Sequence, residues 1–180
     1  MKGKRREELE VPLTIAEKKI SDLTAQWIGN AEYNAFITLT FRSGMKISYN
    51  RAEKLFGRFL YKLKARVFGR NSKRRLPLVA AIEKFDKDDL YRTRDDLNTH
   101  VHVLVRFPGD PKNFKELVAG LWKSCSSVCG DPKVYCPSTD GWFRTPDSSN
   151  FGADVAASYI TKTCRINTDA ILWRYVFLEI

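Results

Sequence analysis

Two histidines stand two residues apart in an apolar segment, at His100 and His102, and the chain has no others. Side chains alternate across a β-strand, so both imidazoles project from one face if residues 99–107 form a strand, and the valines at 101, 103 and 105 take the opposite, core-facing side. Two neighbouring imidazoles can bind one divalent cation. The spacing therefore predicts a metal site, with a pair of partly exposed strand histidines as the alternative.

A carboxylate that could complete this site ends another apolar run, Leu-Val-Ala-Ala-Ile-Glu at 78–83. Burying a lone carboxylate is costly unless it is paired or bound to a metal. If 76–85 and 99–107 pair as a hairpin, Glu83 can lie beside His100 and His102. The alternative is a strand-end glutamate paired with Lys84 or an arginine. Two imidazoles and one carboxylate also describe the metal site of iron oxygenases, so this set alone does not define the reaction.

A tyrosine and a lysine stand three residues apart in a segment that we expect to be helical, 153–165. At about 100° per residue, Tyr159 and Lys162 fall on one face of that helix. A phenol with a reference pKa near 10 is a weak nucleophile at neutral pH unless a cation or metal favours the phenolate. The pair predicts a nucleophile with an assisting cation, and its alternative is a half-buried tyrosine beside a lysine whose stem packs on apolar surface.

The elements that must position these residues follow from hydrophobic periodicity and capping signals. We expect helices at 14–27 (capped by Thr14 and Glu17), from Asn50 to about Val67 (capped by Asn50 and Glu53), near 114–125 and at 153–165. We expect strands at 35–41, 76–85, 99–107 and, less clearly, 171–180. Short strands around Val134 and Phe143 are an option. Strands interrupted by helices, with one hairpin, indicate an α+β fold: a central, mostly antiparallel sheet of about five strands flanked by helices.

Length and charge are typical of one nucleic-acid-binding domain. The 180 residues are 43% hydrophobic, which suffices for one core in a single domain at 11–180 after a charged tail at 1–10. The net charge of +10 favours a polyanionic partner. The absence of a long apolar run and of a signal peptide favours a protein that is cytoplasmic and has no membrane partner. The four cysteines include no CxxC pair, so we expect reduced thiols, with a zinc site at Cys125, Cys129 and Cys136 as a minor alternative.

In combination, these residues resemble the HUH endonuclease superfamily, in particular the single-tyrosine rolling-circle replication initiators (Rep proteins) of plasmids and single-stranded DNA viruses. The resemblance covers about residues 35–165. It is carried by three motifs in the family's order: Phe36-Ile37-Thr38-Leu39-Thr40-Phe41, His100-Val101-His102 and Tyr159-Ile160-Thr161-Lys162. It implies the HUH, ferredoxin-like (split βαβ) nuclease fold and a Mg²⁺ or Mn²⁺ site completed by Glu83.

The activity implied by the resemblance is sequence-specific nicking and joining of single-stranded or hairpin origin DNA, with Tyr159 forming a 5′-phosphotyrosine and Lys162 assisting. Unwinding would come from a host or separate helicase, and the protein would act in the cytoplasm of a host cell that carries the plasmid or virus. A basic row on the helix from Asn50 is equally compatible with a solvated face and with a DNA-backbone contact. The candidate DNA contacts are Thr38, Thr40, Arg42, Lys54, Arg58 and Lys84.

Three other functions share parts of this pattern. A single-tyrosine HUH transposase has the same motif order but usually a glutamine in the tyrosine helix, whereas a relaxase places the tyrosine first. A non-catalytic, ferredoxin-like nucleic-acid-binding domain would need no metal but leaves the histidine spacing unexplained. An iron oxygenase needs a further ligand after the histidine pair, and 103–107 offers none. The segment 86–98 is also longer and more acidic than the turn usual in the HUH family.

Overall fold

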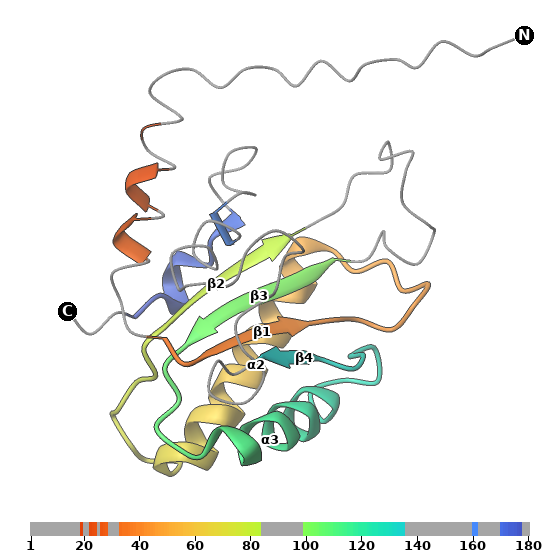
Figure 1. Ribbon diagram of the computed structural model, residues 1–180. Coiled ribbons are helices and arrows are strands. Elements are labelled where there is room, and N and C mark those ends of the chain that lie inside the picture. The colour runs from red at the N-terminus through yellow and green to blue at the C-terminus, as the bar shows by residue number, and fades with distance from the viewer. Residues whose placement is uncertain are drawn as a thin grey trace, which may run out of the picture.

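The protein is built on a four-stranded antiparallel sheet. The computed structural model describes residues 19, 22–24, 26–28, 33–83, 99–135, 160–161 and 170–177. The sheet order is β2-β3-β1-β4, and every pairing is antiparallel (Figure 1). The strands are β1 (Ala35–Leu39), β2 (Leu78–Glu83), β3 (His100–Val105) and β4 (Lys133–Tyr135). The expected α+β class, the antiparallel sheet and the pairing of β2 with β3 are confirmed.

Two long helices, α2 (Tyr49–Phe68) and α3 (Pro111–Lys123), cover one face of the sheet (Figure 1). α2 buries the apolar stripe that its periodicity predicted, at Ala52, Leu55, Phe56, Phe59 and Leu63. Its N-cap is Ser48, however, and the prediction of Asn50 as the cap was wrong. Ser48 is extended and its hydroxyl accepts a hydrogen bond from the backbone N–H of Arg51 at 3.3 Å, so the helix begins one residue earlier.

The core lies between these helices and the sheet. Alternate residues of the three longer strands, β1, β2 and β3, face the helices, among them Ile37, Ala80 and Val103, and all are buried. The predicted core-facing valines of β3 are therefore confirmed. Trp122 of α3 is fully buried, and its indole N–H donates to the carbonyl of Thr40 at 2.7 Å. This bond fixes α3 against the end of β1.

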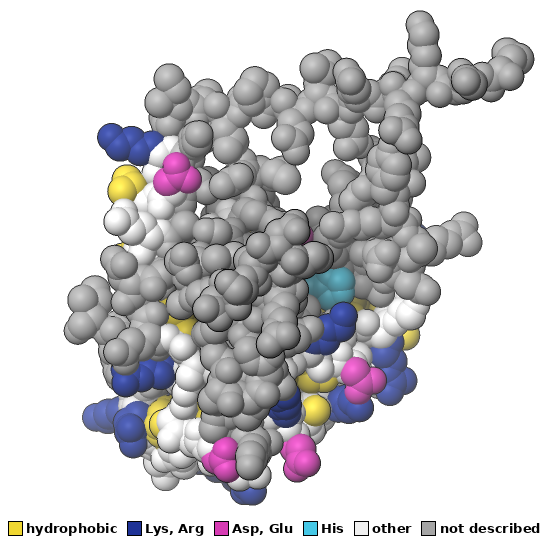
Figure 2. Space-filling view, in the orientation of Figure 1, with side chains coloured by type: hydrophobic (Ala, Val, Ile, Leu, Met, Phe, Trp, Pro, Cys, Tyr) yellow, Lys and Arg dark blue, Asp and Glu magenta, His cyan; other side chains and the backbone are white. Residues whose placement is uncertain are grey.

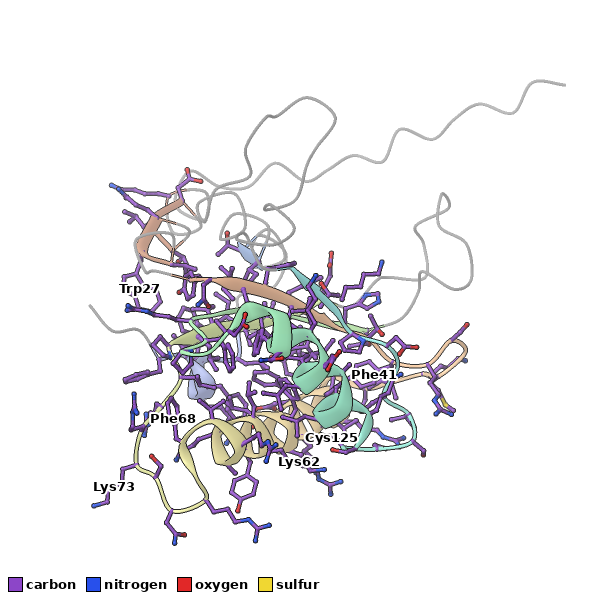
Figure 3. All side chains as sticks on the ribbon, turned by 60° about the horizontal axis from the view of Figure 1, so that its bottom comes forward. Trp27, Phe41, Lys62, Phe68, Lys73 and Cys125 are labelled. Carbon is purple, nitrogen blue, oxygen red and sulfur yellow. The ribbon has the colours of Figure 1, made fainter. Side chains whose placement is uncertain are left out.

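The other sheet face is also partly covered. Its central apolar residues, Phe36, Val79 and Leu104, are buried. Ile160 and Thr161 are helical and buried, and Figures 1 and 3 show this short blue segment on the side of the sheet away from α2 and α3. The described residues between 19 and 28 are helical, in agreement with part of the first expected helix, whose capping residues lie outside the described ranges.

The C-terminal segment does not form the continuous strand expected at 171–180. Phe177 exchanges two backbone hydrogen bonds with Leu78, at 2.7 and 3.0 Å, and the N–H of Leu172 donates to the carbonyl of Ala80 at 2.9 Å. Between these pairings the 3₁₀ turn η4 (Trp173–Tyr175) leaves the edge of β2. The sheet has four strands in the described residues, where about five were predicted, and the optional strand around Phe143 lies outside those residues.

The reason for the interruption is packing on α2. The ring of Tyr175 packs edge-on against Phe56, with centroids 5.2 Å apart. Gly57 leaves room for the Tyr175 hydroxyl, which would lie 2.6 Å from a Cβ at that position. The aromatic contact requires the chain to turn out of the strand conformation between Leu172 and Val176.

Gly130 holds the start of the β4 segment close to β1, and we predict that Gly130→Ala destabilises the protein. A Cβ there would lie 2.9 Å from Thr40 Oγ1 and 3.0 Å from the backbone carbonyl of Phe41. The free energy of unfolding, measured by urea denaturation, should fall by about 1–3 kcal/mol. Gly120→Ala is the control, because a Cβ on that α3 residue meets no atom within 4 Å and should stabilise the helix by up to about 1 kcal/mol. Equal losses in both variants would contradict this account.

Candidate functional site

The strand register places the predicted metal ligands on the sheet face away from α2. Glu83 pairs with His100, and His102 pairs with Thr38, which in turn pairs with Lys133 of β4. Directly opposite residues in an antiparallel pair share a face. The three predicted ligands therefore lie on one face, near the end of the sheet where β2 ends and β3 begins.

Glu83 and His102 are in direct contact. Oε2 of Glu83 lies 2.8 Å from Nε2 of His102, and the two residues are 6% and 5% exposed. The contact is diagonal, because the register pairs Glu83 with the other histidine. A buried carboxylate is tolerated when a polar or charged partner satisfies it. The geometry brings these two residues together as the sequence predicted.

Two further side chains fix the orientation of the His102 ring. Oγ1 of Thr38 lies 3.0 Å from Nδ1, and the ring of Phe36 stacks on the imidazole with centroids 5.6 Å apart and an interplanar angle of 12°. In a neutral imidazole, Nε2 must carry the proton that the Glu83 carboxylate accepts, so Nδ1 accepts from the Thr38 hydroxyl. The ring is therefore held at both nitrogens and on one face.

His100 lies beside this pair, as the register partner of Glu83. Its ring is partly exposed, with its centroid 6.3 Å from that of His102. Figure 2 shows histidine surface next to Lys and Arg side chains. Among the described residues, no three His, Cys, Asp or Glu side chains are grouped closely enough to form a metal site as they stand.

Thr40 and Arg42 lie at the same end of the sheet as the pair. The Thr40 hydroxyl donates to the carbonyl of Asp131 at 2.7 Å, and the Thr40 carbonyl accepts from the N–H of Gly130 at 2.9 Å. Thr40 thus connects β1 to the segment before β4. Arg42 follows β1 and is exposed.

The other predicted DNA contacts are not at this end of the same face. Lys54 and Arg58 are exposed on α2, which packs on the opposite face of the sheet (Figure 3). The sheet separates them from Glu83 and His102. Lys84 lies outside the described residues.

The predicted nucleophile Tyr159 and its neighbour Lys162 also lie outside the described residues. Ile160 and Thr161, the two residues between them in the sequence, are helical and only 0% and 2% exposed. The helical state expected at this point of the motif is therefore present in the described pair.

Sequence reasoning missed Lys133. It is exposed on β4 and pairs with Thr38, so it shares the face of His102. β4 is only three residues long. Its pairing with β1 joins segments that are far apart in the sequence, so local hydrophobic periodicity does not predict it. The alternation in Lys133-Val134-Tyr135 was the available signal, because Val134 is the member that packs against the core.

Cys125 and Cys129 are buried free thiols, as expected for the part of the chain described. Burial raises the pKa of both, that of Cys129 to about 11, to which the neighbouring Cys125 also contributes. Both are therefore protonated at neutral pH in the absence of a bound metal. The third cysteine of the alternative zinc site, Cys136, lies outside the described residues.

No protein-family model matches this chain, and no curated protein or solved structure matches it either. Within the described ranges, none of the helices has the length and apolar character needed to cross a membrane. Function must therefore be inferred from the site residues themselves.

Thr38→Val tests whether the hydroxyl positions His102. Valine keeps the branched shape but leaves the buried Nδ1 without this partner, so the free energy of unfolding should fall by about 1–3 kcal/mol. NMR relaxation of the ring signals should also show greater motion of the His102 ring. Thr38→Ser retains a hydroxyl and should stay close to the wild type in both measurements. If Thr38→Val leaves the ring motion and the stability unchanged, the bond has no positioning role.

Proposed function

We propose that the protein cuts and rejoins single-stranded DNA by metal-dependent transesterification, with Tyr159 as the nucleophile, as a rolling-circle replication initiator of the HUH type. The observation that carries the proposal is the contact between Glu83 and His102. These residues are 19 positions apart, come from different strands, and meet at 2.8 Å in a buried position. The sequence motifs predict that Glu83 and His102 bind the same cation.

The donor atoms fit a divalent cation such as Mg²⁺ or Mn²⁺. Ligands on adjacent corners of an octahedron with bonds of about 2.1 Å lie roughly 3 Å apart. The separation between Glu83 Oε2 and His102 Nε2 is close to this value. His100 is the third donor proposed, because it pairs with Glu83 across the two strands and lies on the same face of the sheet. A cation bound there would polarise a phosphate oxygen and stabilise the negative charge that develops on it.

The chain's own residues supply the rest of the chemistry. The Tyr159 phenol loses its proton, and its oxygen attacks phosphorus to form a new P–O bond. The bond from phosphorus to the 3′ oxygen breaks, and this oxygen leaves as a 3′-hydroxyl after taking up a proton. Because the phosphotyrosine retains the diester, the reaction can run in reverse and rejoin the strand, while the free 3′ end can prime replication.

Cations near the pair support binding of the strand. Lys133 shares the face of His102, and exposed Arg42 follows the end of β1. Lys162 supplies a further positive charge three residues after the nucleophile in sequence. Fixed cations of this kind offset the repulsion between a phosphodiester and a carboxylate such as Glu83.

A second candidate function is a non-catalytic nucleic-acid-binding domain. The direct Glu83–His102 hydrogen bond favours it, because this bond satisfies both buried groups without a metal. The two candidates differ in metal affinity and in covalent chemistry, which the following experiments measure.

We predict that Mn²⁺ binds at the pair. Isothermal titration calorimetry should show one site in the wild type, and His102→Ala or Glu83→Gln should weaken it by more than about tenfold, because each variant removes a ligand. Glu53→Gln is the matched control, since this carboxylate lies on α2 and pairs with Arg174 at 3.3 Å. Mn²⁺ affinity that is the same in Glu83→Gln and Glu53→Gln would exclude Glu83 as a ligand.

We also predict a covalent adduct at Tyr159. A pool of single-stranded oligonucleotides with random internal sequence, labelled at the 3′ end, should yield a labelled protein band in Mn²⁺ that survives denaturation. Tyr159→Phe removes the nucleophilic oxygen and should abolish the band, whereas Lys162→Ala should only slow its formation. Tyr61→Phe, at a 64%-exposed position on α2, is the control and should behave as wild type. An adduct in Tyr159→Phe would assign the nucleophile to another residue.

A further inference from the structure

A basic pocket opens at the end of the sheet opposite the Glu83–His102 pair. It has a volume of about 570 Å³ and lies between the C-terminal end of α2, the start of β2 and the end of β3. Its lining consists of four cations, two aromatic rings and two prolines: Lys73, Arg74, Arg75, Arg106, Phe68, Phe177, Pro77 and Pro108. No acidic side chain lines it in the described part of the chain. Figure 2 shows Lys and Arg side chains gathered at the lower left, where Figure 1 places the loop between α2 and β2.

The loop that carries three of these cations has a defined conformation. Gly69 ends α2 with φ 89°, and its carbonyl accepts from the N–H of Ser72 at 3.3 Å. The Ser72 hydroxyl then accepts from the N–H of Arg74 at 3.1 Å. On the other side, the N–H of Arg106 donates to the carbonyl of Pro77 at 2.9 Å and fixes the end of β3 to the start of β2. The cations therefore stand on a backbone that is held at both ends.

Aromatic rings orient the guanidinium groups. Arg74 lies over the ring of Phe68 at 4.5 Å from its centroid, and Arg75 lies over Phe177 at 5.9 Å. A guanidinium stacked on a ring keeps its N–H edge for hydrogen bonds to an anion. Lys73, Arg74 and Arg75 are exposed and form no salt bridge within the described residues. Figure 3 shows Lys73 on the outer side of the loop and Phe68 closer to the body of the protein.

We infer that this pocket is a second contact site for the phosphate backbone of the bound DNA. Exposed cations hold one small anion weakly, because solvent and salt screen each pair. A nucleic-acid strand with many phosphates binds more tightly, because each phosphate that is neutralised releases counterions. Arginines stacked on aromatic rings are suited to that ligand. The choice of DNA as the occupant rests on the proposed function, whereas the site itself requires no metal and no Tyr159.

The distance between the two sites sets the length of strand that can use both. Five residues of β2 separate Leu78 at the pocket end from Glu83, a span of about 17 Å at roughly 3.4 Å per residue. A strand that keeps the axial rise of about 3.4 Å per nucleotide found in duplex DNA covers that distance in roughly five nucleotides, and a more extended single strand covers it in fewer. A DNA much shorter than this cannot contact both sites.

The experiment measures binding of oligothymidine to the full chain carrying Tyr159→Phe, in EDTA, by fluorescence anisotropy over a range of salt concentrations. Arg74→Ala with Arg75→Ala should weaken binding of a strand of about 25 nucleotides on the order of tenfold, and reduce the slope of log K against log salt by about 1.4, because two phosphate contacts are lost. Lys64→Ala with Arg66→Ala removes the same charge from α2 outside the pocket and should leave the slope nearly unchanged.

Further controls separate folding from binding. Arg74→Lys with Arg75→Lys keeps the charge and should retain most of the salt slope, and thermal melting of every variant shows whether it is folded. A slope that is unchanged in the folded alanine variant would overturn the inference. So would co-sedimentation with vesicles rich in phosphatidylserine that depends on Arg74 and Arg75 while DNA binding does not.

The same alanine substitutions in a chain that retains Tyr159 distinguish this inference from the proposed function. If the wild-type protein forms no adduct but Arg74→Ala with Arg75→Ala reduces the salt slope in EDTA, the pocket binds DNA and the nuclease proposal fails. If the alanine variant that retains Tyr159 forms the adduct on a strand of about 25 nucleotides at the wild-type rate, and the salt slope is unchanged, the pocket inference fails and the nuclease proposal stands.

Discussion

The buried contact between Glu83 and His102 constrains the rest of the structure. An unpaired carboxylate in this position would cost several kcal/mol, and removal of one partner from a buried pair typically costs about 3–5 kcal/mol. The contact exists only if β2 and β3 keep their observed register, because a slip of β2 by one residue would turn Glu83 to the opposite face from His102. The pair therefore fixes the register of the hairpin that carries it, and Thr38 extends the constraint to β1.

The two faces of the sheet carry different kinds of side chain. The face toward α2 and α3 is apolar throughout, with Trp122 and Phe59 packed edge to face at 5.9 Å. This packing makes the sheet a rigid support, so the opposite face can hold polar groups in a fixed geometry. The apolar stripe of α2 has to face the core, so the exposed residues Lys54 and Arg58 of this helix lie on its outer side, away from the sheet.

Local periodicity explains which parts of this arrangement could be predicted from the sequence. The β1 and β3 strands, the apolar stripe of α2 and the common face of the two histidines all follow from repeats of 2 or 3.6 residues. Contacts that depend on tertiary packing could not be predicted in that way. Lys133 reaches the site through a three-residue strand, and Tyr175 interrupts the last strand by packing on Phe56. The diagonal reach of Glu83 to His102, past its register partner, depends on side-chain rotamers that no spacing encodes.

The Thr38 hydroxyl makes the site compatible with two states of His102. When Glu83 accepts the proton on Nε2, the hydroxyl donates to Nδ1. If Nε2 were instead used as a ligand, as the proposed function requires, Nδ1 would carry the proton, and the same hydroxyl could accept it by rotating about its C–O bond. A carboxylate or amide oxygen at this position could only accept, and would favour one tautomer. Glu83 and His102 thus satisfy each other in the structure, and under the proposed function Thr38 would remain bonded to the ring when the proton on Nε2 is exchanged for a ligand.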